Sequence, residues 1–259
     1  MSGIIGIAST RNVMPGVLQG LQQIPQTGHQ HCGLVVHGQQ GNTPSPPRLH
    51  RHRRAQGAAA WIQHLRDPAH AFAPSQQPCP GHSLNALHGH VALGHTGPAS
   101  GTGPQALHRA LPQLSHGPDA HLNSPARVAV VMHGTLQASP ALREALSERD
   151  YLFKSDSSAE LLAHLIDATC ENDPVQALHR ALALVQGPLS LGVLFHAQPE
   201  CLYAMHRGQD LHAAASPTDL AWSSHPLALQ PGRQALPSLA KGQVLEVHAN
   251  GQSVTHRIL

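Results

Sequence analysis

The chain has 259 residues, of which 41% are hydrophobic, so it is long and apolar enough to bury a sizeable core. Its formal net charge of only +2 excludes the strong overall field that drives non-specific binding to nucleic acid or to a membrane surface. No apolar run approaches the roughly 18 residues of a membrane span, and the N-terminus lacks the basic region of a secretory signal. We therefore expect a cytoplasmic protein with no nucleic-acid or membrane partner.

The first nine residues carry the strongest local signal of the N-terminal half. Residues 4–8 are apolar apart from Gly6. This pattern is typical of a buried strand whose backbone is closely approached by another group at the glycine. Such a strand places Ser2 within the fold, where its own α-amino group could act as a general base if Ser2 were a nucleophile. The pattern then predicts a helix over 12–24, a strand over 33–38, a helix with a basic beginning over 48–66, a loop over 67–85 and a strand over 90–95.

The second half shows clearer elements. Residues 127–132 form a β-branched run typical of a strand buried on both faces. Ser139 is expected to cap a helix that starts at Pro140 and buries Leu142, Ala145 and Leu146. Helices follow over 158–170, which should bury Leu161, Leu162, Leu165 and Ile166, and over 175–185. Strands are expected over 189–195, 201–206, 211–215, 220–224 and 243–247. These elements predict one α+β domain, with helices packed on stacked sheets.

Metal and cofactor chemistry finds little support. The 23 histidines include pairs two residues apart, but no carboxylate or cysteine joins them at ligand spacing. The four cysteines form no Cys-x-x-Cys pair, so they signal neither a zinc site nor a redox couple. We expect no metal site and no cofactor. The basic run over 48–54 has no aromatic platform beside it, which favours a solvated surface over a nucleic-acid site.

The order of several short motifs resembles the class II (N-terminal nucleophile) glutamine amidotransferases, and among them the glutaminase half of glucosamine-6-phosphate synthase. The motifs are Ser2-Gly3-Ile4-Ile5-Gly6, Leu93-Gly94-His95-Thr96, Val130-Val131-Met132-His133-Gly134, Tyr151-Leu152-Phe153-Lys154-Ser155-Asp156 and Leu239-Ala240-Lys241-Gly242-Gln243-Val244. The resemblance covers nearly the whole chain. It implies a four-layer αββα sandwich and a single amidotransferase-like domain over residues 1–259.

The family's chemistry implies which positions to inspect. Its N-terminal cysteine attacks the side-chain amide of glutamine, and an Asn side chain with a Gly N–H forms the oxyanion hole. The resemblance places Ser2 at the nucleophile, His133 at the oxyanion Asn and Gly134 at the oxyanion Gly. Only Gly134 retains the family residue.

The substrate-binding positions also differ. Gly97 stands where the family has the Arg that holds the glutamine carboxylate, and Ser158 where it has the Asp that holds the ammonium group. Ser100 replaces a family Thr conservatively, and Thr27 stands at a family Arg near the nucleophile. Asp156 lies two residues from Ser158 and could partly replace the missing carboxylate.

Two functions remain open. The first is a catalytically impaired amidotransferase-like domain that acts as a binding, regulatory or structural subunit with a protein partner. The second is an active amidohydrolase or amidotransferase that uses Ser2 on an altered substrate.

Overall fold

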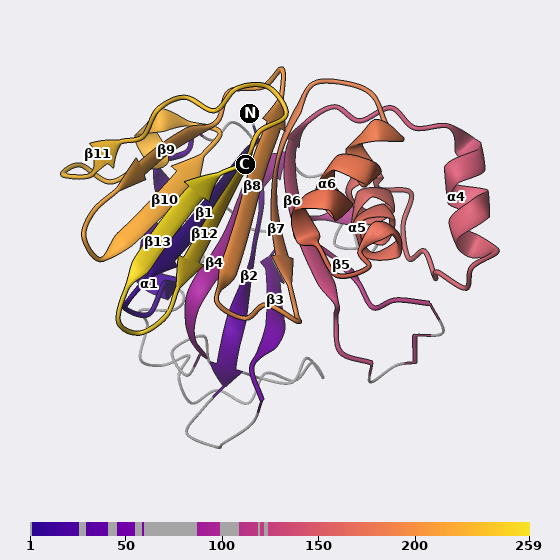
Figure 1. Cartoon of the computed structure of the whole chain (residues 1–259), viewed down its shortest axis with the longest axis horizontal. Coiled ribbons are helices and arrows are strands. Elements are labelled where there is room, and N and C mark those ends of the chain that lie inside the picture. Colours follow the sequence, from indigo (N-terminus) through magenta and orange to yellow (C-terminus); the bar gives the residue numbers. More distant parts are fainter. Residues whose placement is uncertain are drawn as a thin grey trace.

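The computed structural model describes residues 2–25, 30–40, 46–54, 59, 87–98, 109–118, 120–121 and 124–259. Within that part of the chain, two antiparallel sheets lie face to face with helices on both outer sides (Figure 1). The first sheet has the strand order β11-β9-β10-β1-β4-β2-β3. Its strands are β1 (Gly3–Ser9), β2 (Gln30–Gln40), β3 (Arg48–Arg54), β4 (Leu87–Pro98), β9 (His212–Ala215), β10 (Asp219–Ser223) and β11 (Gln234–Ala235).

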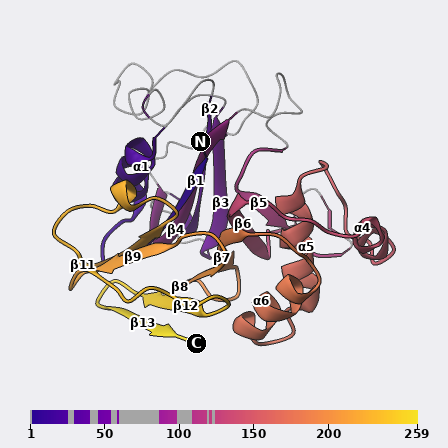
Figure 2. The same cartoon turned by 90° about the horizontal axis from the view of Figure 1, so that it is seen from above.

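The second sheet has the order β13-β12-β8-β7-β6-β5. Its strands are β5 (Gln113–Ser115), β6 (Val128–Gly134), β7 (Leu189–Phe195), β8 (Cys201–Arg207), β12 (Val244–Ala249) and β13 (Val254–Ile258). The helices are α1 (Met14–Gln23), α4 (Pro140–Ser147), α5 (Ser158–Thr169), α6 (Pro174–Ala183) and the short η3 (Pro226–Ala228). Figure 2 shows α1 and η3 on one side of the sheets and α4, α5 and α6 on the other. The predicted αββα sandwich is confirmed.

Strand β1 is buried along its whole length between β10 and β4. Because side chains alternate along a strand, Ile4 and Ala8 face the second sheet, whereas Ile5 and Ile7 face α1. The apolar run in the sequence therefore serves two cores at once. The third core lies on the outer face of the second sheet, where Leu162 and Ile166 of α5 pack.

Trp222 fills the space between the sheets at the level of Gly6. Trp222 on β10 is fully buried, and its indole ring lies against Gly6 of the first sheet and Gly192 of the second. A Cβ added at Gly6 would lie 2.3 Å from Trp222 Cε2, and one at Gly192 would lie 2.3 Å from Cη2. Both glycines are therefore required by this close approach.

One element prediction is wrong. Residues 48–54 form strand β3 on the edge of the first sheet, not the beginning of a helix, and pair antiparallel with β2. The pairing with β2 supplies backbone partners that a single-sequence pattern does not reveal, and Leu49 is buried against the other sheet. Except for Ala59, the rest of the predicted helix and the predicted loop over 67–85 lie outside the described residues.

Helix α4 agrees with its prediction only in position. Ser139 is the N-cap residue, but its side chain accepts no hydrogen bond from the helix. Only Leu146 is buried, while Ala145 is exposed and Leu142 is half-buried.

The sequence pattern also missed the strands β5, β11 and β13. No helix in the described ranges is both long and apolar enough to cross a membrane.

The fit around Trp222 gives a stability prediction. Gly192→Ala forces a methyl group into the indole ring and Leu93, so it should lower the free energy of unfolding by about 1–3 kcal/mol. Urea denaturation measures this change. The matched control is Gly251→Ala, whose new methyl group would meet nothing closer than 3.7 Å. Equal stability of the two variants would contradict the tight fit.

Candidate functional site

Ser2 lies directly before β1 and is half-buried. Its Oγ is 2.9 Å from Nδ1 of His133, which is the penultimate residue of β6 in the second sheet. In the tautomer that carries its proton on Nε2, Nδ1 of His133 accepts a hydrogen bond from the hydroxyl group of Ser2. The structure thus brings together two predicted site residues that are 131 positions apart in the chain.

Gly134 ends β6 in a backbone conformation that favours glycine. Its φ is +112°, and an added Cβ would lie 2.4 Å from the carbonyl oxygen of Pro188. The following N–H, that of Thr135, donates to the same carbonyl at 2.8 Å. Both the backbone conformation and the contact with Pro188 therefore exclude a side chain at position 134, so only backbone atoms follow His133 there.

Gly97 lies next to Ser2, because Gly3 pairs with Thr96 of β4. A Cβ at Gly97 would be 2.9 Å from Ser2 Cβ and 2.8 Å from Cε1 of His95. The imidazole of His95 thus occupies the space in which a side chain at position 97 would begin. Any larger residue at 97 requires this ring to shift.

The histidines near Ser2 favour the neutral state. Burial, followed by the charges of His133 and His31, lowers the pKa of His95 to about 3. Burial also lowers the pKa of His133, with a smaller contribution from His225, and it lowers that of His31, with a smaller contribution from Arg53. At neutral pH these rings are therefore uncharged. None of the three can act as a fixed positive charge beside Ser2.

Ser158 and Asp156 lie on the segment that leads into α5. Ser158 is the exposed first residue of the helix, and within the described ranges no hydrogen bond joins it to Ser2 or His133. Both carboxylate oxygens of Asp156 accept hydrogen bonds from Arg109, at 2.6 and 2.8 Å. This ion pair engages the carboxylate that could have replaced the missing Asp. Ser100 and Thr27 lie outside the described residues.

Sequence reasoning gave no site role to His95 or His31. The strand period of two was the available signal, because it puts residues 95 and 97 on the same face of β4. His31 is paired with Gly97 across β2 and β4. Across the described part of the chain, no group of three or more His, Cys, Asp or Glu side chains is placed to hold a metal ion.

The arrangement supports one kind of polar chemistry. A hydroxyl at hydrogen-bond distance from a neutral imidazole can transfer its proton during attack on a carbonyl carbon. The site offers no described cation next to Ser2 that would hold a carboxylate. Within the described residues, the geometry is thus compatible with a nucleophile–base pair.

Comparison with known proteins agrees with the fold. No family model matches the chain. It is 29% identical over 213 residues to a glutamine–fructose-6-phosphate aminotransferase of Legionella pneumophila (strain Paris), which covers 82% of this chain and 30% of the relative. The corresponding enzyme of Zymomonas mobilis is 27% identical over 258 residues, covering 98% of this chain and 36% of the relative. The chain thus spans about a third of the length of these curated relatives.

Two solved structures share the fold of this chain at lower sequence identity. The glutamine phosphoribosylpyrophosphate amidotransferase of B. subtilis, complexed with ADP and GMP, superposes with a TM-score of 0.71 at 18% identity. The match covers 98% of this chain and 48% of that one. A second structure, described as the allosteric regulatory enzyme of purine biosynthesis, gives a TM-score of 0.68. The chain is therefore similar in sequence and fold to the class II glutamine amidotransferases, and it has the N-terminal nucleophile hydrolase fold.

Proposed function

We propose that this domain has lost glutamine hydrolysis and acts as a binding, regulatory or structural subunit with a protein partner. The observation that carries the proposal is Gly97, which offers no side chain to a substrate carboxylate and whose Cβ space is filled by His95 and Ser2. We place this function in the cytoplasm, which fits the free thiols of Cys32, Cys170 and Cys201.

The free energy of glutamine binding that is lost can be estimated from typical hydrogen-bond contributions. A hydrogen bond to a charged group contributes about 1.5–3 kcal/mol, and both ends of zwitterionic glutamine lose such a partner when Gly97 and Ser158 replace Arg and Asp. The neutral His95 does not compensate for the missing cation. Removal of an oxyanion donor typically costs a further 2.7–4 kcal/mol, although effects within one site are not additive.

The first test of the proposal is glutamine hydrolysis by the full chain. Purified protein should release no ammonia from glutamine above a Ser2→Ala control. Ser2→Cys, which restores the family nucleophile, should also stay inactive because the carboxylate clamp is absent. A coupled assay of glutamate and ammonia measures both. Ammonia release by the unmodified chain or by Ser2→Cys, absent in Ser2→Ala, would show that Gly97 is no obstacle to turnover.

The second test concerns the partner. Cross-linking in the source cells, followed by mass spectrometry of the captured chain, should give the same cross-links to one other protein in repeated experiments. Variants at the exposed residues Leu152 and Leu227 serve to map that contact. If only cross-links within the chain are recovered, the subunit role is wrong.

A second candidate function is favoured by the contact between Ser2 and His133. In this alternative, His133 Nδ1 takes the proton of Ser2 Oγ while Oγ bonds to a substrate carbonyl carbon, and the proton then passes to the leaving group. Water would hydrolyse the resulting ester. The substrate would be an amide or ester without the charged ends of glutamine, because the described site supplies no charged partners for them.

This alternative predicts a defined reaction with a fluorophosphonate probe. The probe should form an Oγ–P bond at Ser2 with loss of fluoride, and peptide mass spectrometry locates the bond. His133→Ala should slow the labelling by roughly 100-fold or more, the usual contribution of a general base. Ser9→Ala, at the other end of β1, should label like the unmodified chain.

The pH dependence of labelling gives an independent check. A general base works only when it is unprotonated, and burial lowers the pKa of His133 below its ordinary value of 6.5. The labelling rate should therefore decrease as the pH falls, with a midpoint below pH 6.5. A midpoint at or above 6.5, or a rate unaffected by His133→Ala, would argue against His133 as the base.

A further inference from the structure

The backbone pairing between β1 and β10 stops before it reaches Ser2. The pair nearest to Ser2 joins Ile5 to Ser223, and the residues before Ile5 lie beyond the register of these two strands. On the opposite side, the pairing of β1 with β4 continues to Gly3 and Thr96. The start of β1 therefore needs another support on the side of β10, because an unpaired buried backbone group costs about as much free energy as a lost hydrogen bond.

Two consecutive serines at the end of β10 supply this support. The carbonyl oxygen of Ile4 accepts hydrogen bonds from the Ser223 hydroxyl at 2.7 Å and from the Ser224 N–H at 3.1 Å. The Ile4 N–H donates to the Ser224 hydroxyl at 2.9 Å. Ile4 is fully buried, so water cannot replace these partners. The serine hydroxyl groups thus extend the attachment of β1 to β10 by one residue, toward Ser2.

The packing around Gly3 leaves the chain little freedom between Ile4 and Ser2. A Cβ added at Gly3 would lie 2.7 Å from Cγ2 of Ile24 and 3.3 Å from Oγ of Ser224. The backbone of Gly3 therefore lies directly against the Ser224 hydroxyl. Any shift at Ser224 reaches Ser2 through a single closely packed residue.

The same segment also approaches the imidazole that is hydrogen-bonded to Ser2. Burial lowers the pKa of His133, and the charge of the neighbouring His225 lowers it further. The His225 N–H donates to the Ser223 hydroxyl at 3.1 Å, so the turn that carries His225 is tied to a serine that supports β1. Residues 223–225 are thus linked to both members of the Ser2–His133 pair.

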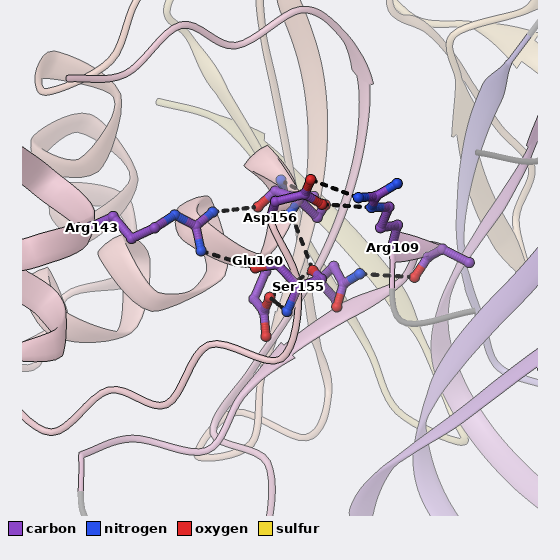
Figure 3. A network of polar contacts seen from close by, with 9 residues as sticks. Arg109, Arg143, Ser155, Asp156 and Glu160 are labelled. Atoms are coloured by element: carbon purple, nitrogen blue, oxygen red, sulfur yellow. Dashed lines mark hydrogen bonds and ion pairs between the residues drawn. The ribbon is translucent and has the colours of Figure 1, made fainter. Parts of the chain in front are cut away.

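A catalytic imidazole is commonly oriented by a carboxylate. Across the described ranges, no carboxylate is hydrogen-bonded to Ser2 or His133. The carboxylate of Asp156 is held instead by Arg109, at 2.6 and 2.8 Å (Figure 3). The geometry of the Ser2–His133 pair therefore depends on how the start of β1 is held.

We propose that Ser224 is a positioning residue for Ser2. Its hydroxyl fixes the Ile4 N–H and thereby keeps Ser2 Oγ within hydrogen-bond distance of His133 Nδ1. This role of Ser224 rests on the second candidate function proposed above, in which Ser2 attacks a carbonyl carbon. Ser224 acts through the backbone of β1 and takes no part in the proton transfer. Placement matters because a displacement of about 1 Å can slow a reaction roughly 100-fold.

Fluorophosphonate labelling of Ser2 in variants of the full chain tests this role. Ser224→Ala removes the hydroxyl and should slow the labelling by roughly 10- to 100-fold. Ser224→Thr keeps the hydroxyl and should restore most of the rate. The matched control is Ser9→Ala, because Ser9 Oγ donates to the Thr218 carbonyl at 3.3 Å and accepts from the Arg11 N–H at 3.1 Å. It removes a buried serine hydroxyl at the opposite end of β1 and should leave the rate unchanged.

The titration of His133, followed through the NMR signals of its ring, gives a readout that needs no reaction. The spectrum of His133→Ala identifies these signals. Burial and the hydrogen bond from Ser2 both favour the neutral ring, so loosening the contact raises the pKa of His133 toward its ordinary value of 6.5. The midpoint should therefore rise in Ser224→Ala and stay unchanged in Ser9→Ala.

Two results would overturn this role of Ser224, once urea denaturation has shown that the variants are folded. One is an unchanged His133 midpoint in Ser224→Ala. The other is an equal effect of Ser224→Ala and Ser9→Ala on labelling and on the midpoint, which would assign both serines to stability alone. If the unmodified chain is not labelled, the second candidate function is wrong, and the His133 midpoint alone decides on Ser224.

Discussion

The burial of β1 on both faces is the constraint on which the rest of the structure depends. Ile4 and Ala8 contribute to the core between the sheets, and Ile5 and Ile7 to the core under α1. A strand that is buried on both sides cannot shift by one residue without exchanging these two sets of side chains. Its register with β4 and β10 is therefore fixed, and with it the position of Ser2.

The described histidines near Ser2 carry no charge at neutral pH. His95, His133 and His31 surround the Ser2 region as neutral rings, since burial disfavours their protonated forms. A neutral, histidine-lined site stabilises a hydroxyl proton donor well but holds a zwitterion poorly. The fold is thus that of the N-terminal nucleophile hydrolases, while these three rings carry no charge at neutral pH.

Much of the fold was accessible from the sequence. Strand β1 and helix α5 were predicted because their apolar patterns are long and uninterrupted, and the burial of Leu161, Leu162, Leu165 and Ile166 follows from helical periodicity. Strand β3 was not, because its arginines and histidines give no apolar alternation apart from Leu49. Its identity as a strand comes from pairing with β2, a tertiary contact that outweighs local propensity.

The same error hid the common face of Arg51 and Arg53 on β3. In a helix, Arg51 and Arg53 would be related by a rotation of about 200° about the helix axis and would lie on nearly opposite sides. In a strand they share one face. The proximity of Ser2 and His133 was likewise not contained in any local pattern, since they lie on different sheets and came together only through the family resemblance. His95 is the one site residue that strand periodicity alone could have placed beside Gly97.

The stacking of Trp222 between Gly6 and Gly192 has a consequence for the chemistry at Ser2. The indole lies between the two sheets, Ser2 directly precedes β1 of the first sheet, and His133 lies in β6 of the second. The distance between their side chains therefore depends on the separation of the two sheets. The 2.9 Å distance between Ser2 Oγ and His133 Nδ1 is then coupled to packing deep in the core.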